Sequence, residues 1–185
     1  FVRPRNATIA RQLVRISVPR LGEGLVATLA EFPFNALLLS FGTDVNAAYQ
    51  VGRRAYQQVT GPLSRGYNVA ASVVVGQALG EGARTGGDAS DARFQGWATA
   101  ALGALTVGGV GLLLVAAAPW VVRLFTDDPG TVRYGVGFTR TYGVGAVFLV
   151  TFVVLSGALQ GGSDTRTPFV ARTTGLLGFY LGASY

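Results

Sequence analysis

Cysteine, histidine, lysine and methionine are absent from this 185-residue chain, and all fifteen basic residues are therefore arginine. Without Cys or His there can be no disulfide, thiol nucleophile, histidine general base or Cys/His zinc site. The sequence also contains no Gly-rich phosphate loop, no Asp-rich metal cluster and no nucleophile with an adjacent base. We therefore expect no enzymatic activity and no metal site. Because the chain begins at Phe1 and has no Met, we expect it to be a fragment whose missing portion lies upstream.

Charge is also scarce. Only 13% of the residues are charged, half are hydrophobic and the mean hydropathy is +0.42, whereas a soluble domain has about a quarter charged residues. We therefore expect membrane lipid as the surrounding solvent. The net charge of +6 does not indicate a nucleic-acid partner, because the arginines alternate with long apolar stretches and form no single basic patch.

Long apolar segments recur along the chain, separated by short turns rich in Gly, Asp and Arg. Residues 1–20 carry five arginines and no small-residue cleavage pattern, so they are predicted to be a basic cytoplasmic connector and not a signal peptide. The rest is predicted to be an all-α integral membrane bundle of about five transmembrane helices, the last of them cut short. The predicted helices are residues 21–41, 45–78, 93–120, 132–159 and 169–185.

Two of these segments have distinctive compositions. The segment 45–78 is unusually polar, and Gly61-Pro62 within it predicts a kink. The segment 93–120 is apolar and rich in glycine, which lets neighbouring backbones approach closely where lipid removes the hydrophobic drive between helices. The glycines that we expect to allow this approach are Gly103, Gly108, Gly109 and Gly111.

Three short segments, in this order and with one helix between successive members, resemble the multidrug and toxic compound extrusion (MATE) family. They are Val75–Gly82, Leu124–Pro129 and Gly157–Pro168. The opening Arg15–Pro19, with Glu23 just behind it, is similar to the start of the seventh helix in that family. The wider group also includes lipid and oligosaccharide flippases.

The resemblance implies two six-helix lobes that rock around a central cavity while a cation is exchanged for an organic substrate. This chain would supply an incomplete second lobe, helices seven to eleven, and its partner would be the missing N-terminal lobe. A first-lobe assignment stays open, because internal repeats make the halves alike. The implied function is an antiporter of the plasma membrane that exports organic, mainly cationic, compounds in exchange for sodium ions or protons, with no cofactor besides this coupling ion. The alternatives are a flippase of lipid-linked sugars and a non-transporting membrane scaffold.

Glu31 is the most informative single residue, because it falls near the middle of the first segment. A carboxylate at that depth is costly, so we interpret it as the cation-coupling site. The alternative is that the helix starts later or kinks at Pro33, leaving Glu31 solvated in a cavity without a coupling role. The fourth segment has no carboxylate between Tyr134 and Gly157, where some family members carry one.

Aromatic and amide side chains in the first two segments, with one arginine in the fourth, are candidates for lining the substrate cavity. Such groups suit varied organic cations; the alternative role is hydrogen bonding between helices. Arg53 and Arg54 are instead interpreted as snorkelling to an interface. The cavity candidates are Asn35, Tyr49, Gln50, Tyr56, Gln57, Asn68 and Arg140.

The loop acids are predicted to have structural roles. Asp127 and Asp128 precede Pro129, and the run from Asp164 to Pro168 is typical of a helix start, with Asp164 or Thr165 as cap and the proline in the first turn.

Arginine placement predicts the orientation in the membrane. Most arginines between the predicted helices lie on the side that holds residues 1–20 and Arg84, and basic residues are retained in the cytoplasm. Asp44 and Asp127 should then face outside. In this Cys-free chain an Asp127→Cys substitution should react with a membrane-impermeant thiol reagent added from outside. Labelling from the cytoplasmic side alone would show that the orientation is wrong.

Overall fold

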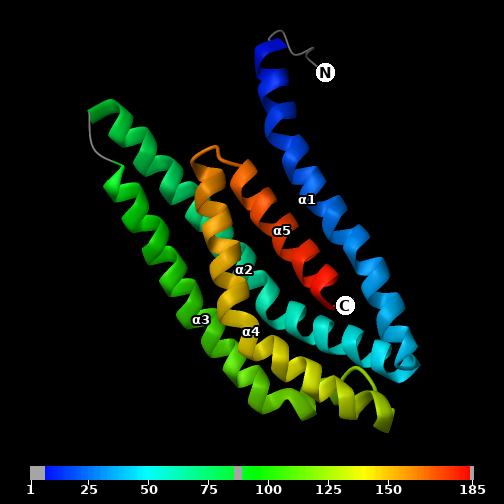
Figure 1. The fold of residues 1–185 in the computed structure, drawn as a ribbon. Helices are drawn as coiled ribbons and strands as arrows, with labels where there is room; N and C mark the ends of the chain where they lie inside the picture. The colour runs from blue at the N-terminus through cyan, green and yellow to red at the C-terminus, as the bar shows by residue number, and fades with distance from the viewer. Residues whose placement is uncertain (1–6, 86–88, 184–185) are drawn as a thin grey trace, which may run out of the picture. The chain divides into compact units, whose positions relative to one another are not determined.

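The computed structural model describes residues 7–85 and 89–183, which form five helices and no strand (Figure 1). Two compact units are described separately: the terminal unit, residues 1–35 with 163–185, and the α2–α4 unit, residues 36–162. The predicted all-helical architecture is confirmed. The helices are α1 (Ala7–Ser40), α2 (Thr43–Thr85), α3 (Ser90–Arg123), α4 (Pro129–Gly161) and α5 (Arg166–Ala183).

Most helices extend beyond the predicted segments. α1 begins at Ala7, so the described part of the basic connector is itself helical. α2 continues past Ala78 to Thr85, where a loop was expected. Glu81, Ala83 and Arg84 are good helix formers, and they outweigh the low helix propensity of Gly80 and Gly82. Among the described helices, α3 and α4 are long and apolar enough to cross a membrane.

Phe41 and Gly42 form the short connection between α1 and α2. Gly42 has φ +117°, a conformation that side chains with a Cβ rarely adopt. The predicted tight turn is therefore confirmed, although Thr43 and Asp44 already belong to α2.

α2 is continuous through Pro62. Proline has no N–H, so the carbonyl of Gln58 lacks its usual helical donor, which is a standard cause of bending. Figure 1 shows α2 changing direction along its length, as the Gly61-Pro62 pair predicted.

α4 packs against both α2 and α3, and glycine makes the approach to α2 possible. A Cβ on Gly157 would collide with the backbone oxygen of Asn68, and one on Gly161 with the backbone oxygen of Ser72. The two glycines form a Gly-x-x-x-Gly pair on one face of α4, which is a common motif for close helix packing in membranes.

The α3–α4 contact uses glycine in the same way. A Cβ on Gly111 would lie 2.5 Å from the backbone oxygen of Gly143, and one on Gly108 would lie 2.6 Å from Val147 Cγ2. The predicted close approach is thus confirmed for these two glycines and for Gly103, whereas Gly109 faces open space. A buried apolar cluster fills the centre of the three helices: Ala71, Ala100, Val107, Val150 and Val154.

Replacing Gly157 with alanine should destabilise the α2–α4 unit. Alanine is the better helix former by about 1 kcal/mol, but overpacking against a rigid backbone costs about 1–3 kcal/mol. We expect a lower thermal unfolding midpoint in detergent for Gly157→Ala. Gly145→Ala is the matched control, since nothing lies within 4 Å of its Cβ position and its midpoint should be unchanged or higher. Equal midpoints for the two variants would contradict the packing argument.

Aspartates cap α4 and α5, as the loop motifs predicted. The Thr131 backbone N–H donates to Asp128 Oδ2 at 2.7 Å, and Pro129 occupies the first turn of α4. Asp164 accepts from the Thr167 hydroxyl and backbone N–H at 2.6 and 3.0 Å, and from the Arg166 N–H at 3.0 Å. The hydrogen bonds from Thr131 hold the pKa of Asp128 below its ordinary value, and those from Thr167 do the same for the pKa of Asp164.

A carboxyl whose pKa is lowered by folding stabilises the folded state above its unfolded pKa, and that contribution disappears as the pH falls through the folded pKa. Asp128→Ala should therefore lower the unfolding midpoint in detergent at pH 7, and the difference from wild type should shrink as the pH falls through the lowered pKa of Asp128. Asp127→Ala, which removes the same charge beside the cap, should have no such effect. A pH-independent difference for Asp128→Ala would contradict the role of the ionised carboxylate.

Candidate functional site

Glu31 and Asn35 lie one helical turn apart on α1, in the terminal unit. Both side chains are half-buried, and each already interacts with neighbouring groups. α1 begins at Ala7 and is continuous through Pro33, so the helix does not start late at this point. Glu31 is thus a partly shielded carboxylate inside a continuous helix.

The tyrosines of α2 belong to an aromatic cluster shared with α4. Tyr56 stacks on Tyr142 with ring centroids 5.4 Å apart and an interplanar angle of 21°. Tyr49 meets Phe138 edge to face at 5.7 Å and lies 6.4 Å from Tyr142. We call these four residues the aromatic cluster.

Ring contact within the cluster limits what its tyrosines can offer a substrate. Tyr49 is only 8% exposed, so its ring serves helix packing in this arrangement, while Tyr56 is half-buried and keeps part of its surface accessible. Phe138 and Tyr142 were not singled out from the sequence. Their i, i+4 spacing on α4, opposite the i, i+7 spacing of Tyr49 and Tyr56 on α2, is the signal that could have found them.

Polar atoms without partners accompany the aromatic cluster. Among the residues that the structure describes, the Asn46 side-chain oxygen and the Thr139 hydroxyl are buried and make no hydrogen bond. Thr139 is fully buried on α4 where the helix meets Gly52 of α2. Unsatisfied buried polar atoms cost free energy. The hydrogen-bonding groups at this end of the α2–α4 interface are therefore less well satisfied than those at the end with Gly157 and Gly161.

Asn68 is committed to a contact between helices. Its side-chain amide donates to the backbone oxygen of Val153 on α4 at 2.7 Å. The neighbouring Tyr67 hydroxyl lies 2.9 Å from the Thr106 hydroxyl of α3. The structure therefore places Asn68 where the alternative role, hydrogen bonding between helices, applies.

Gln57 lies on a different face of α2 from the aromatic cluster. With Arg54 and Gln58 it lines an open pocket of about 310 Å³, closed on one side by Phe125 from the connection after α3. Of the other cavity candidates, Gln50 is half-buried and has an interaction partner, and Arg140 is exposed on α4. The α2 candidates thus divide between an aromatic interface and a polar pocket.

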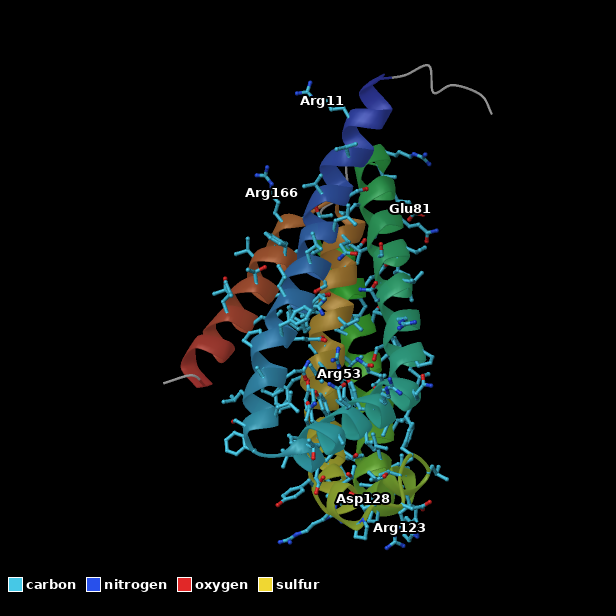
Figure 2. All side chains as sticks on the ribbon, turned by 90° about the vertical axis from the view of Figure 1, so that its right-hand side faces the viewer. Arg11, Arg53, Glu81, Arg123, Asp128 and Arg166 are labelled. Carbon is cyan, nitrogen blue, oxygen red and sulfur yellow. The ribbon has the colours of Figure 1, made fainter. Side chains whose placement is uncertain are left out.

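The α2–α4 unit has two distinct ends. Figure 2 shows Glu81 toward one end and Arg123 and Asp128 toward the other, beside the connection between α3 and α4. The aromatic cluster draws on the first half of α2 and the first half of α4, whereas Asn68 and the Gly157–Gly161 pair lie in the second halves. No group of three or more acidic residues able to hold a metal ion occurs within the part of the chain that the structure describes.

Comparison with known proteins gives one family and several relatives. The family model described as MatE matches residues 19–183. A probable multidrug resistance protein NorM from Burkholderia mallei is 32% identical over 162 residues, which is 82% of this chain and 34% of that protein. The corresponding protein of Thermotoga maritima is 24% identical over 90% of this chain, and the multidrug resistance protein NorM of Burkholderia vietnamiensis is 29% identical over 92%. The chain spans about a third of the length of these relatives. No solved structure matches it at a comparable level of significance.

Proposed function

Because the chain belongs to the MatE family, we propose that it forms part of a secondary antiporter that exports organic cations in exchange for sodium ions or protons. In the proposed transporter, this chain forms most of the second lobe and packs with an N-terminal lobe. The transporter lies in the plasma membrane. The names of the relatives, multidrug resistance proteins, support export of varied organic compounds.

The observation that carries the proposal is Glu31, a half-buried carboxylate inside the continuous helix α1. An acid in the membrane can alternate between holding a cation and releasing it when the surroundings open to the other side. A single carboxylate can bind either a sodium ion or a proton, so either ion fits the proposed coupling site. The accessible part of Tyr56 and the half-buried Gln50 offer a π face and an amide to an organic cation.

A flippase of lipid-linked sugars is the second candidate within transport, and a wide cavity lined by several arginines would favour it. The polar pocket on α2 contains one arginine, Arg54, so it supports the flippase hypothesis less well. A non-transporting scaffold is disfavoured by the number of charged and amide side chains along α2.

Glu31→Gln in the full-length protein should abolish or strongly reduce ion-driven export of a fluorescent organic cation from vesicles. The amide keeps the size of the side chain and should preserve membrane insertion, but it can neither bind a proton nor neutralise sodium. Glu81→Gln is the matched control, because Glu81 is exposed near the end of α2, and it should export at the wild-type rate.

The dependence of export on pH and on sodium should be measured for both variants. If properly inserted Glu31→Gln protein exports at the wild-type rate with unchanged ion dependence, Glu31 is only a solvated cavity residue. Coupling would then have to reside outside this chain.

A further inference from the structure

The lining of the pocket on α2 includes no member of the aromatic cluster, and the proposed transport cycle does not use it. Its lining combines a guanidinium and two primary amides from consecutive turns of α2 with the ring of Phe125. We propose that this pocket binds the phosphate group of an anionic phospholipid, with its acyl chains toward Phe125.

The polar side of the pocket suits a phosphate. Arg54, Gln57 and Gln58 are spaced i, i+3 and i+4, which places them on one face of a helix. Guanidinium donors match phosphate oxygens in pairs, and such charge-assisted hydrogen bonds are stronger than neutral ones. The two amides add further donors beside the guanidinium.

These donors are available for a ligand. Arg54, Gln57 and Gln58 are exposed, and none of them makes a hydrogen bond or ion pair with another residue in the described part of the chain. Arg53, the adjacent arginine, is half-buried and already has a partner. No carboxylate lines the pocket. Of the two aspartates that follow Phe125 in the sequence, Asp127 is exposed, and Asp128 Oδ2 accepts the Thr131 N–H in the α4 cap.

The position and the apolar side of the pocket favour a lipid over a free anion. Phe125 lies two residues after the end of α3, one of the two described helices apolar enough to cross a membrane. Leu124 and Phe125 are 83% and 44% exposed, so apolar surface lies next to the donors. A phosphate on Arg54 with acyl chains against these side chains reproduces the layering of a membrane interface, where basic residues attract anionic headgroups.

The test is titration of the full-length detergent-solubilised protein with phosphatidylglycerol, with bound lipid counted by native mass spectrometry. Removing any one basic residue near the membrane surface weakens the general attraction to anionic lipid by a similar, modest factor. Arg133→Gln measures that background, because Arg133 is exposed in the first turns of α4 and does not line the pocket. We expect Arg54→Gln to weaken the tightest phosphatidylglycerol binding about tenfold more than Arg133→Gln does.

Two further measurements make the outcome decisive. Arg54→Lys keeps the charge but loses the paired donors, so its affinity should fall between those of wild type and Arg54→Gln, with unfolding midpoints unchanged. Equal losses for Arg54→Gln and Arg133→Gln would overturn the site in favour of general electrostatics. Inorganic phosphate at millimolar concentration should not displace the lipid; full displacement would show a free-phosphate site and overturn the lipid assignment.

Discussion

The arrangement of the α2–α4 unit depends on the direct approach of α4 to the backbone of α2. At Gly157 and Gly161 the only groups that fit between the helices are hydrogen atoms, because the carbonyl oxygens of Asn68 and Ser72 occupy the space a side chain would need. In lipid the hydrophobic effect does not drive helices to associate. Close van der Waals contact and the hydrogen bond from Asn68 to Val153 therefore hold α2 and α4 together here. That contact fixes which face of α2 meets α4.

Once this face is fixed, the roles of the polar residues on α2 follow from their register. Tyr49 and Tyr56 lie on the face of α2 that packs against Phe138 and Tyr142 of α4. Arg54, Gln57 and Gln58 lie on another face of α2, where they line a pocket. The interface therefore changes character along its length. The helices approach closely on both sides of Pro62, at Gly52 before it and at Gly157 and Gly161 beyond it. Before Pro62 the interface is aromatic and contains polar atoms without partners, whereas beyond Pro62 it includes the Asn68 hydrogen bond.

The number of helices, the turn at Gly42, the bend at Pro62 and the caps at Asp128 and Asp164 were predictable, because each depends on local chemistry within a few residues. Helix ends were less predictable: Gly80 and Gly82 suggested a loop, but their helix-forming neighbours carry α2 on to Thr85. The site could be predicted only as a list of residue types. Asn68 and Gln57 look equivalent in the sequence, and only the packing of α4 separates an interhelical hydrogen bond from a pocket wall.

The same packing limits where the proposed organic substrate could contact this chain. A side chain that already completes a helix contact can take part in transport only if that contact opens. Asn68 and Tyr49 are held in this way, by a hydrogen bond and by buried ring contacts. Tyr56 still has free surface on the same half of α2, before the bend and next to the part of the interface where buried polar atoms lack partners. In this unit, rearrangement costs least where hydrogen bonds are already missing, so the half of α2 before Pro62 is the part best suited to change shape around a ligand.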